Sequence, residues 1–126
     1  MTNLHSLENF MESWWDWSFL NDCFGDSKIR VSDTDGTVEH NHQFLTLETR
    51  APGEGLDRGR WLWCERRVES GVDTIFLLWG RPNDAREMSI FPGGKFAATA
   101  ETIRSHVKAW YEAARRGQCY AAGVGG

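Results

Sequence analysis

The stretch "DTDGTVEHNHQFLTLETR" (residues 33–50) decides the fold that this sequence predicts. It holds two runs in which polar and apolar residues alternate, and this is the pattern of β-strands. Asn41 and His42 separate the runs, at the place of a two-residue turn. The stretch therefore predicts a β-hairpin, with one strand over residues 29–39 and the other over residues 43–50.

A two-residue turn also sets the register of the hairpin. It places Asp35 directly opposite Glu48, and Asp33 opposite Arg50. Successive side chains of a strand point to opposite faces, and the leucines of the second strand must face the core. Glu48 and Arg50 are therefore expected on the wetter side of the hairpin.

Two opposed carboxylates repel each other and destabilise the strand pair. The residues can remove this repulsion by sharing a proton, which raises the pKa of the pair, or by binding a cation. Oxygen ligands from Asp and Glu suit hard divalent ions such as magnesium. The same spacing also fits a simple cross-strand ion pair between Asp33 and Arg50 at the surface, with Asp35 and Gly36 in a turn.

The rest of the chain adds three helices and two strands. The expected elements are helices over residues 6–15, over 57–69 and from Thr99 or Thr102 to Gly117, a buried central strand over "TIFLLWG" (74–80), and a short edge strand over 88–91. This order predicts an α/β protein, with a mixed central β-sheet flanked by helices. Residues 1–126 are expected to form a single domain, with residues 116–126 as a flexible tail.

Composition limits the classes of protein to which the chain can belong. Its 126 residues suit one domain, and its formal charge is −4. Cys23, Cys64 and Cys119 are widely spaced, so reduced thiols are expected rather than a disulfide framework. Because the sequence has no signal-peptide pattern and no apolar run near the roughly 20 residues that span a bilayer, we expect a cytoplasmic protein without a membrane partner.

Basic residues cluster in two parts of the chain despite the negative total. They are Arg50, Arg58, Arg60, Arg66 and Arg67 in the middle, and Arg104, Lys108, Arg115 and Arg116 in the last helix. Such a face can bind phosphate, or it can be an ordinary solvated surface. One or two tryptophans around residues 14–17 could also stack on bases, although most of the tryptophans are expected in the core.

The segments "SDTDG", "FLTLETR" and "PGEGLDRGR" resemble the PD-(D/E)XK nuclease superfamily, in a small phage-type branch related to VRR-NUC domains. The motif of that superfamily is an acid, a spacer, and then acid-x-lysine on the next strand. Asp35 followed by Glu48-Thr49-Arg50 matches it here, with arginine in place of lysine. The resemblance covers roughly residues 15–79 and implies a restriction-endonuclease-like core.

The resemblance also implies the roles of individual residues. Asp35 and Glu48 would ligate Mg²⁺ or Mn²⁺, with the Thr49 carbonyl as a third ligand. Arg50 stands at the position of the lysine that positions and activates water, and Arg60 stands where relatives have glutamine. An arginine stays charged and cannot act as a general base, but its planar fork can orient water or clamp a phosphate.

Further residues complete the implied site. An acid of the first helix, Glu8 or Glu12, would join the metal ligands. Arg58 and Lys95 would contact nucleic acid together with Arg50 and Arg60, and the basic residues of the last helix would hold the backbone of the nucleic acid.

The resulting functional prediction is a phage-encoded, metal-dependent endo- or exonuclease that works in the bacterial cytosol and that could act as a homodimer. The alternative is a lapsed nuclease-fold protein that binds nucleic acid or protein, such as a phage inhibitor of a host factor. A third reading is a structural interaction domain whose acidic hairpin binds nothing.

Overall fold

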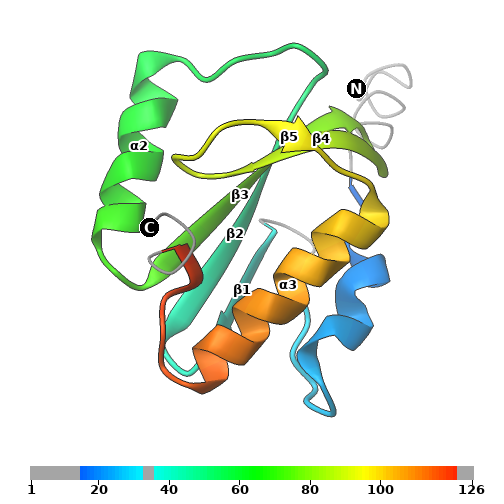
Figure 1. Ribbon diagram of the computed structural model, residues 1–126, viewed down its shortest axis with the longest axis vertical. Coiled ribbons are helices and arrows are strands. Elements are labelled where there is room, and N and C mark those ends of the chain that lie inside the picture. The colour runs from blue at the N-terminus through cyan, green and yellow to red at the C-terminus, as the bar shows by residue number, and fades with distance from the viewer. Residues whose placement is uncertain (1–14, 33–35, 122–126) are drawn as a thin grey trace, which may run out of the picture.

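A five-stranded mixed sheet organises the structure, a computed structural model that describes residues 15–32 and 36–121 (Figure 1). Its elements are η1 (Ser18–Phe24), β1 (Thr37–His40), β2 (Gln43–Arg50), α2 (Arg58–Glu69), β3 (Asp73–Arg81), β4 (Asp84–Ile90), β5 (Phe96–Ala97) and α3 (Ala100–Arg115). The strands lie in the order β1-β2-β3-β4-β5, and only β2 and β3 are parallel. This arrangement confirms the predicted mixed sheet flanked by helices.

The hairpin turn has the predicted position and register. Asn41 and His42 have φ angles of 52° and 66°, so both occupy the left-handed region that a type I′ turn requires. Two contacts support these non-glycine residues, since Asn41 Nδ2 donates to the Ala114 carbonyl and the His42 N–H donates to the Glu39 carboxylate. Residues pair across the turn as the prediction requires.

The first strand of the hairpin is much shorter than predicted. The expected strand over residues 29–39 is wrong, because β1 begins only at Thr37. The Ser32 N–H donates to the Thr37 carbonyl at 2.9 Å, and the Gly36 N–H donates to the Ser32 carbonyl at 3.0 Å. These bonds join Ser32 to Gly36 and Thr37, so local hydrogen bonding outweighs the alternating pattern at Ser32.

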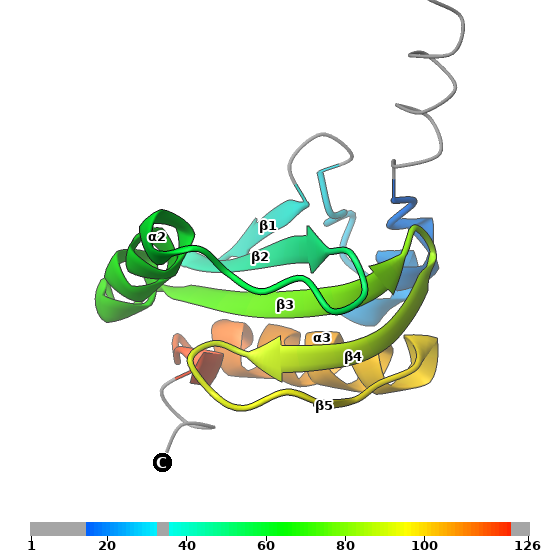
Figure 2. The ribbon, with the colours of Figure 1, turned by 90° about the horizontal axis from the view of Figure 1, so that it is seen from above.

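Strand β3 is the central strand that its apolar run predicts. Its side chains alternate between two clusters, with Ile75 and Leu77 on the α2 side, and Phe76 and Leu78 on the side of η1 and α3. Figure 2 shows α2 and α3 on either side of the sheet. The predicted edge strand over residues 88–91 is wrong, because β4 pairs with both β3 and β5, and the short β5 forms that edge.

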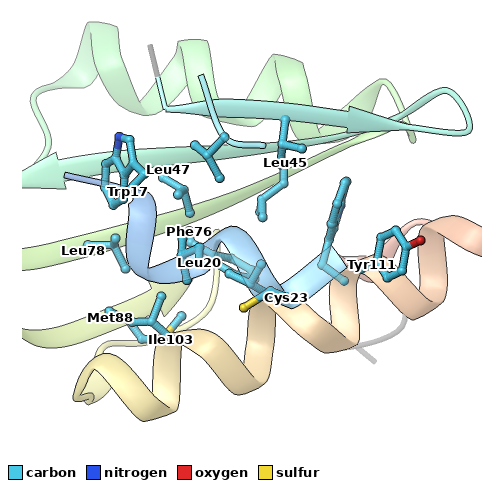
Figure 3. Close-up of a cluster of buried hydrophobic side chains, with 14 of the residues drawn as sticks. Trp17, Leu20, Cys23, Leu45, Leu47, Phe76, Leu78, Met88, Ile103 and Tyr111 are labelled. Atoms are coloured by element: carbon cyan, nitrogen blue, oxygen red, sulfur yellow. The ribbon is translucent and has the colours of Figure 1, made fainter. Parts of the chain in front are cut away.

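The larger core lies between the sheet, η1 and α3 (Figure 3). The segment expected as an irregular connection contains the 3₁₀ helix η1, which buries Leu20, Cys23 and Phe24. Trp15 and Trp17 are also buried and stack on each other, with ring centroids 5.6 Å apart. They belong to the core and do not offer an open surface for bases.

Both long helices have the predicted caps. Asp57 accepts a hydrogen bond from the Arg60 N–H at the start of α2, and Thr99 forms a capping box with Thr102 at the start of α3. Gly71 and Gly117 follow the two helices with φ angles of 80° and 70°, as glycine at this position permits.

The last helix and the residues after it pack against the sheet. A buried stripe along α3 contains the predicted Ile103, Val107, Trp110 and Ala114. Within the segment expected as a tail, the Ala121 N–H donates to Thr74 Oγ1 at 3.2 Å. In the parts of the chain that the structure describes, no helix combines the length and the apolar character needed to cross a membrane.

His106 makes the stability of the fold depend on pH. Its Nδ1 lies 2.7 Å from the Tyr120 hydroxyl, and its ring packs against Phe76 and Phe96. Burial lowers the pKa of His106 below its ordinary value of 6.5. As pH falls through 6.5, the unfolded chain therefore takes up a proton that the folded protein resists, and the folded state loses stability.

We expect urea denaturation to show this loss as a fall in the free energy of unfolding between pH 7 and pH 5. The His106→Phe variant should lack this component. Its free energy of unfolding should therefore fall less than that of the wild type between pH 7 and pH 5, and the difference between the two proteins should stay constant between pH 7 and pH 8. A difference that is the same at all these pH values would contradict the assignment to His106.

Candidate functional site

Strand β2 carries Glu48 and Arg50 to the face of the sheet that α2 covers. Leu45 and Leu47 point into the larger core, so the residues between and after them point to the opposite face. The side chains of Glu48 and Arg50 are 20% and 18% exposed. The wetter side expected for them is therefore a partly buried face beneath a helix, where charges interact more strongly than in open water.

Two arginines compensate the charge of Glu48. Its Oε1 lies 3.5 Å from Arg50 Nη2 and 3.7 Å from Arg60 Nε. Arg50 comes from the same strand, whereas Arg60 comes from the first turn of α2. The structure thus brings together three predicted site residues that lie up to twelve positions apart in the sequence, and we call them the Glu48 cluster.

A loop glutamate fixes the guanidinium of Arg50. Arg50 Nη1 donates to Glu54 Oε1 at 3.0 Å, and the Trp79 indole N–H donates to the Glu54 carbonyl. The buried Arg50 Nε forms no hydrogen bond with any residue in the described ranges 15–32 and 36–121. Arg50 therefore keeps one buried donor that a bound group could use.

A ring on α2 positions Arg60. The guanidinium carbon of Arg60 lies 4.7 Å from the centre of the Trp63 ring, and that of Arg67 lies 4.5 Å from the same centre. Such cation–π contacts hold flat cations in place. Trp63 thereby orders a row of positive charge along the side of α2 that faces the sheet.

A second ionic group lies at the other end of β2. Arg67 Nε donates to Asp73 Oδ2 at 2.6 Å, and Thr46 Oγ1 donates to Asp73 Oδ1 at 3.3 Å. Burial raises the pKa of Asp73, and the neighbouring Arg67 acts in the opposite direction. The sequence analysis does not single out Asp73. The position of this acid just before an apolar strand was the signal that could have indicated it.

The remaining predicted site residues lie in several places. Asp35, Glu8 and Glu12 fall outside the described residues. Thr49 is half-buried and, with Arg50, lines a pocket of about 270 Å³ at the carboxyl end of β2. Within residues 15–32 and 36–121, no three His, Cys, Asp or Glu side chains group closely enough to hold a metal ion.

Gly36 nevertheless brings the chain next to Asp35 close to β2. The Leu47 N–H donates to the Gly36 carbonyl at 2.8 Å. Gly36 has a φ of 62°, and a Cβ atom at this position would lie 2.9 Å from the Leu47 carbonyl oxygen. Only glycine allows this approach, which sets the residue after Asp35 against the residue before Glu48.

The predicted nucleic-acid-binding residues divide into two groups. Arg50, Arg60 and Lys95 lie on the α2 face, where the Lys95 ammonium is 4.3 Å from the centre of the Trp79 ring. Arg58 is exposed at the first position of α2.

The basic residues of α3 are not part of this face. Arg104 clamps α3 to η1 through two hydrogen bonds to Asp22, at 2.6 and 2.9 Å, and a third to the Phe19 carbonyl. Arg115 pairs with Glu112 on the same helix. Since α3 packs on the opposite face of the sheet from α2, its basic residues lie apart from the Glu48 cluster, and their contact with a nucleic-acid backbone stays a prediction.

Cys64 is the thiol on the same side of the sheet as Glu48. It is fully buried, and burial together with the negative charge of Glu48 raises its pKa. A thiol of this kind remains protonated and is a poor nucleophile. The chemistry of the site therefore depends on its carboxylate and guanidinium groups.

No protein-family model, curated protein or solved structure matches the chain.

Proposed function

We propose that the protein is a metal-dependent nuclease that hydrolyses phosphodiester bonds at the Glu48 cluster. The observation that carries the proposal is the meeting of Glu48, Arg50 and Arg60 on one partly buried face. Glu48 and Arg50 lie on the second strand of the hairpin, and Arg60 lies on the crossover helix that follows. In the resemblance to PD-(D/E)XK nucleases these residues stand at the acid, lysine and glutamine positions, with arginine at the last two.

The carboxylate of Glu48 suits a hard divalent cation. Its Oε1 lies 3.5 Å from Arg50 and 3.7 Å from Arg60, and its side chain is 20% exposed, so a cation can approach the carboxylate. A carboxylate oxygen of this kind is a fitting ligand for Mg²⁺ or Mn²⁺. The contact between Gly36 and Leu47 supports Asp35 as the second carboxylate, because these residues adjoin Asp35 and Glu48 in the chain.

The side chains of the Glu48 cluster would divide the work of hydrolysis. Glu48 and Asp35 would hold the ion, and a bound magnesium ion supplies positive charge beside the phosphate and lowers the pKa of water. Arg50 would orient the attacking water or hold a phosphate oxygen through its planar guanidinium. Arg60 would neutralise charge that grows on the phosphate during the attack.

Incubation with supercoiled plasmid, single-stranded DNA and RNA, each in magnesium, manganese or chelator, tests the proposal. We expect cleavage only with metal, and its loss in Asp35→Ala. If no substrate is cleaved and DNA binding weakens steeply as salt rises, the result would instead favour a binding module with the same fold.

A specific contact favours that binding module as the second candidate. Because Glu48 Oε1 faces two guanidinium groups, the protein itself already balances the charge of the carboxylate. A lapsed nuclease of this kind would keep Arg50 and Arg60 for phosphate binding without activating water.

Restoring the lysine of the motif tests what arginine at position 50 does to the rate of cleavage. We expect Arg50→Lys to raise the metal-dependent cleavage rate about tenfold, because a lysine amine can assist proton transfer whereas a guanidinium cannot. Rates measured on a fluorescent oligonucleotide would show the gain. Arg86→Lys, at an exposed ion pair with Asp84, serves as the matched control and should leave the rate unchanged. A rate for Arg50→Lys below that of the wild type would contradict this expectation.

A further inference from the structure

An aromatic recess opens beside the Glu48 cluster. It has a volume of about 200 Å³, and the rings of Trp61, Trp79 and Phe91 line it together with Lys95. Strand register fixes its position, since Trp79 pairs with Arg50 and Leu77 pairs with Glu48 between β3 and β2. The recess and the Glu48 cluster are therefore neighbours on the α2 face of the sheet.

Trp61 gives this recess an open aromatic wall. Trp61 is 42% exposed to solvent, whereas Trp79 is buried against the sheet. The Trp61 ring packs edge-on against Phe91, with centroids 4.6 Å apart and planes at 62°. Its indole N–H donates to Glu65 on the same helix at 3.4 Å. These two contacts hold the ring in one orientation while much of its surface stays open to a ligand.

One cation borders the aromatic rings of the recess, and a second lies on the helix that carries Trp61. Lys95 places its ammonium 4.3 Å from the centre of the Trp79 ring and 4.0 Å from Glu87. Arg60, the residue before Trp61, reaches toward Glu48. Open aromatic surface beside cations is the combination that binds single-stranded nucleic acid, because bases stack on the rings and phosphates contact the cations.

We propose that this recess binds an unpaired nucleobase next to the phosphodiester held at the Glu48 cluster. The position of the cleaved bond rests on the proposed nuclease function, whereas the binding of the base does not require cleavage. A base within a duplex is stacked on its neighbours and cannot offer its face to Trp61. The recess therefore selects single-stranded segments, through a base face that DNA and RNA share.

Fluorescence anisotropy in chelator tests the recess without cleavage. The probes are a labelled single-stranded DNA, an RNA of the same sequence, the DNA duplex, and a strand with abasic sites. We expect Trp61→Ala to weaken binding of the single strands about tenfold, in line with the loss of one stacked base, while Trp61→Phe keeps most of the affinity. Binding to the duplex and to the abasic strand should not change.

Phe44→Ala is the matched control, because Phe44 is similarly exposed, at 37%, and lies at the other end of β2. It should bind all probes like the wild type. A loss confined to DNA or to RNA would support the recess and identify the sugar that it prefers. Equal affinity of Trp61→Ala and wild type for both single strands, or equal losses on duplex and single strands, would overturn the proposal.

The two proposals can fail separately in these experiments. Metal-dependent cleavage combined with no effect of Trp61→Ala would leave the nuclease standing and remove the base-binding recess. Binding of single strands that depends on Trp61, without cleavage of any substrate, would keep the recess and remove the nuclease.

Discussion

Replacing Glu48 by glutamine is expected to lower metal-dependent cleavage by at least about a hundredfold, because a charged ligand contributes several kcal/mol to binding the ion and stabilising the transition state. Glutamine keeps the size of the side chain and removes its negative charge. Arg50 keeps its contact with Glu54, so the guanidinium does not lose every partner. Single-turnover cleavage at saturating Mg²⁺ measures the effect.

The stability of this variant should change little. Glu48 meets its two arginines at 3.5 and 3.7 Å, which are long contacts for ion pairs, and such pairs contribute about 1 kcal/mol or less. Glu112→Gln is the matched control, since Glu112 also pairs with an arginine but lies on α3, across the sheet from the site. Cleavage by Glu48→Gln within threefold of the control would contradict a role for Glu48 in metal binding.

The largest effect on stability is expected from Trp110→Ala, which should lower the free energy of unfolding by about 3–5 kcal/mol. Trp110 is 1% exposed and has the largest of the fully buried side chains in the described part of the chain. Its ring packs edge-on against Phe24 of η1, and its indole N–H donates to the Phe44 carbonyl of β2 at 3.2 Å. One side chain therefore joins α3, η1 and the sheet.

Because single domains have a total stability of about 5–15 kcal/mol, this variant should melt far below the wild type or fail to fold. Trp110→Phe keeps an aromatic ring in the core and loses the N–H contact and part of the ring volume, so its cost should be smaller, about 1–2 kcal/mol, and remain measurable. Urea denaturation followed by circular dichroism measures both. A cost below about 1 kcal/mol for Trp110→Ala would show that the larger core tolerates a cavity there.

Local patterns explain why most of the fold could be predicted. The apolar run of β3 predicts a central strand, and the caps at Asp57 and Thr99 predict where both long helices begin. The turn at Asn41 and His42 sets the register of the hairpin. Each of these signals acts within a few residues, so the sequence contains it directly.

The errors arise where hydrogen bonds, near or distant in sequence, outweigh the alternating pattern of a segment. The stretch before β1 alternates like a strand, but the Ser32 N–H donates to the Thr37 carbonyl, and the strand begins only at Thr37. Strand β4 reads as a short edge strand because its first half is polar, yet β5 pairs with it and removes the edge. The residue pattern within one strand cannot predict which later strand of the chain will pair with it.

The candidate site, like the fold, could be predicted from the sequence only in part. The motif predicts that Glu48 and Arg50 share a face, because the strand period requires it. It does not predict that α2 covers this face, that Glu54 holds Arg50, or that Trp61 and Trp79 line a recess beside it. These contacts depend on how the crossover helix packs, which the spacing of residues within β2 cannot specify.

Counting bound manganese by electron paramagnetic resonance tests most directly whether residues 35 and 48 share an ion. We expect the wild type to bind Mn²⁺ at one tight site, and we expect Asp35→Asn and Glu48→Gln each to weaken that site at least about tenfold, since each removes a charged ligand. The Glu112→Gln control should bind like the wild type. Equal Mn²⁺ binding by all four proteins, or none by the wild type, would contradict a metal site at the Glu48 cluster.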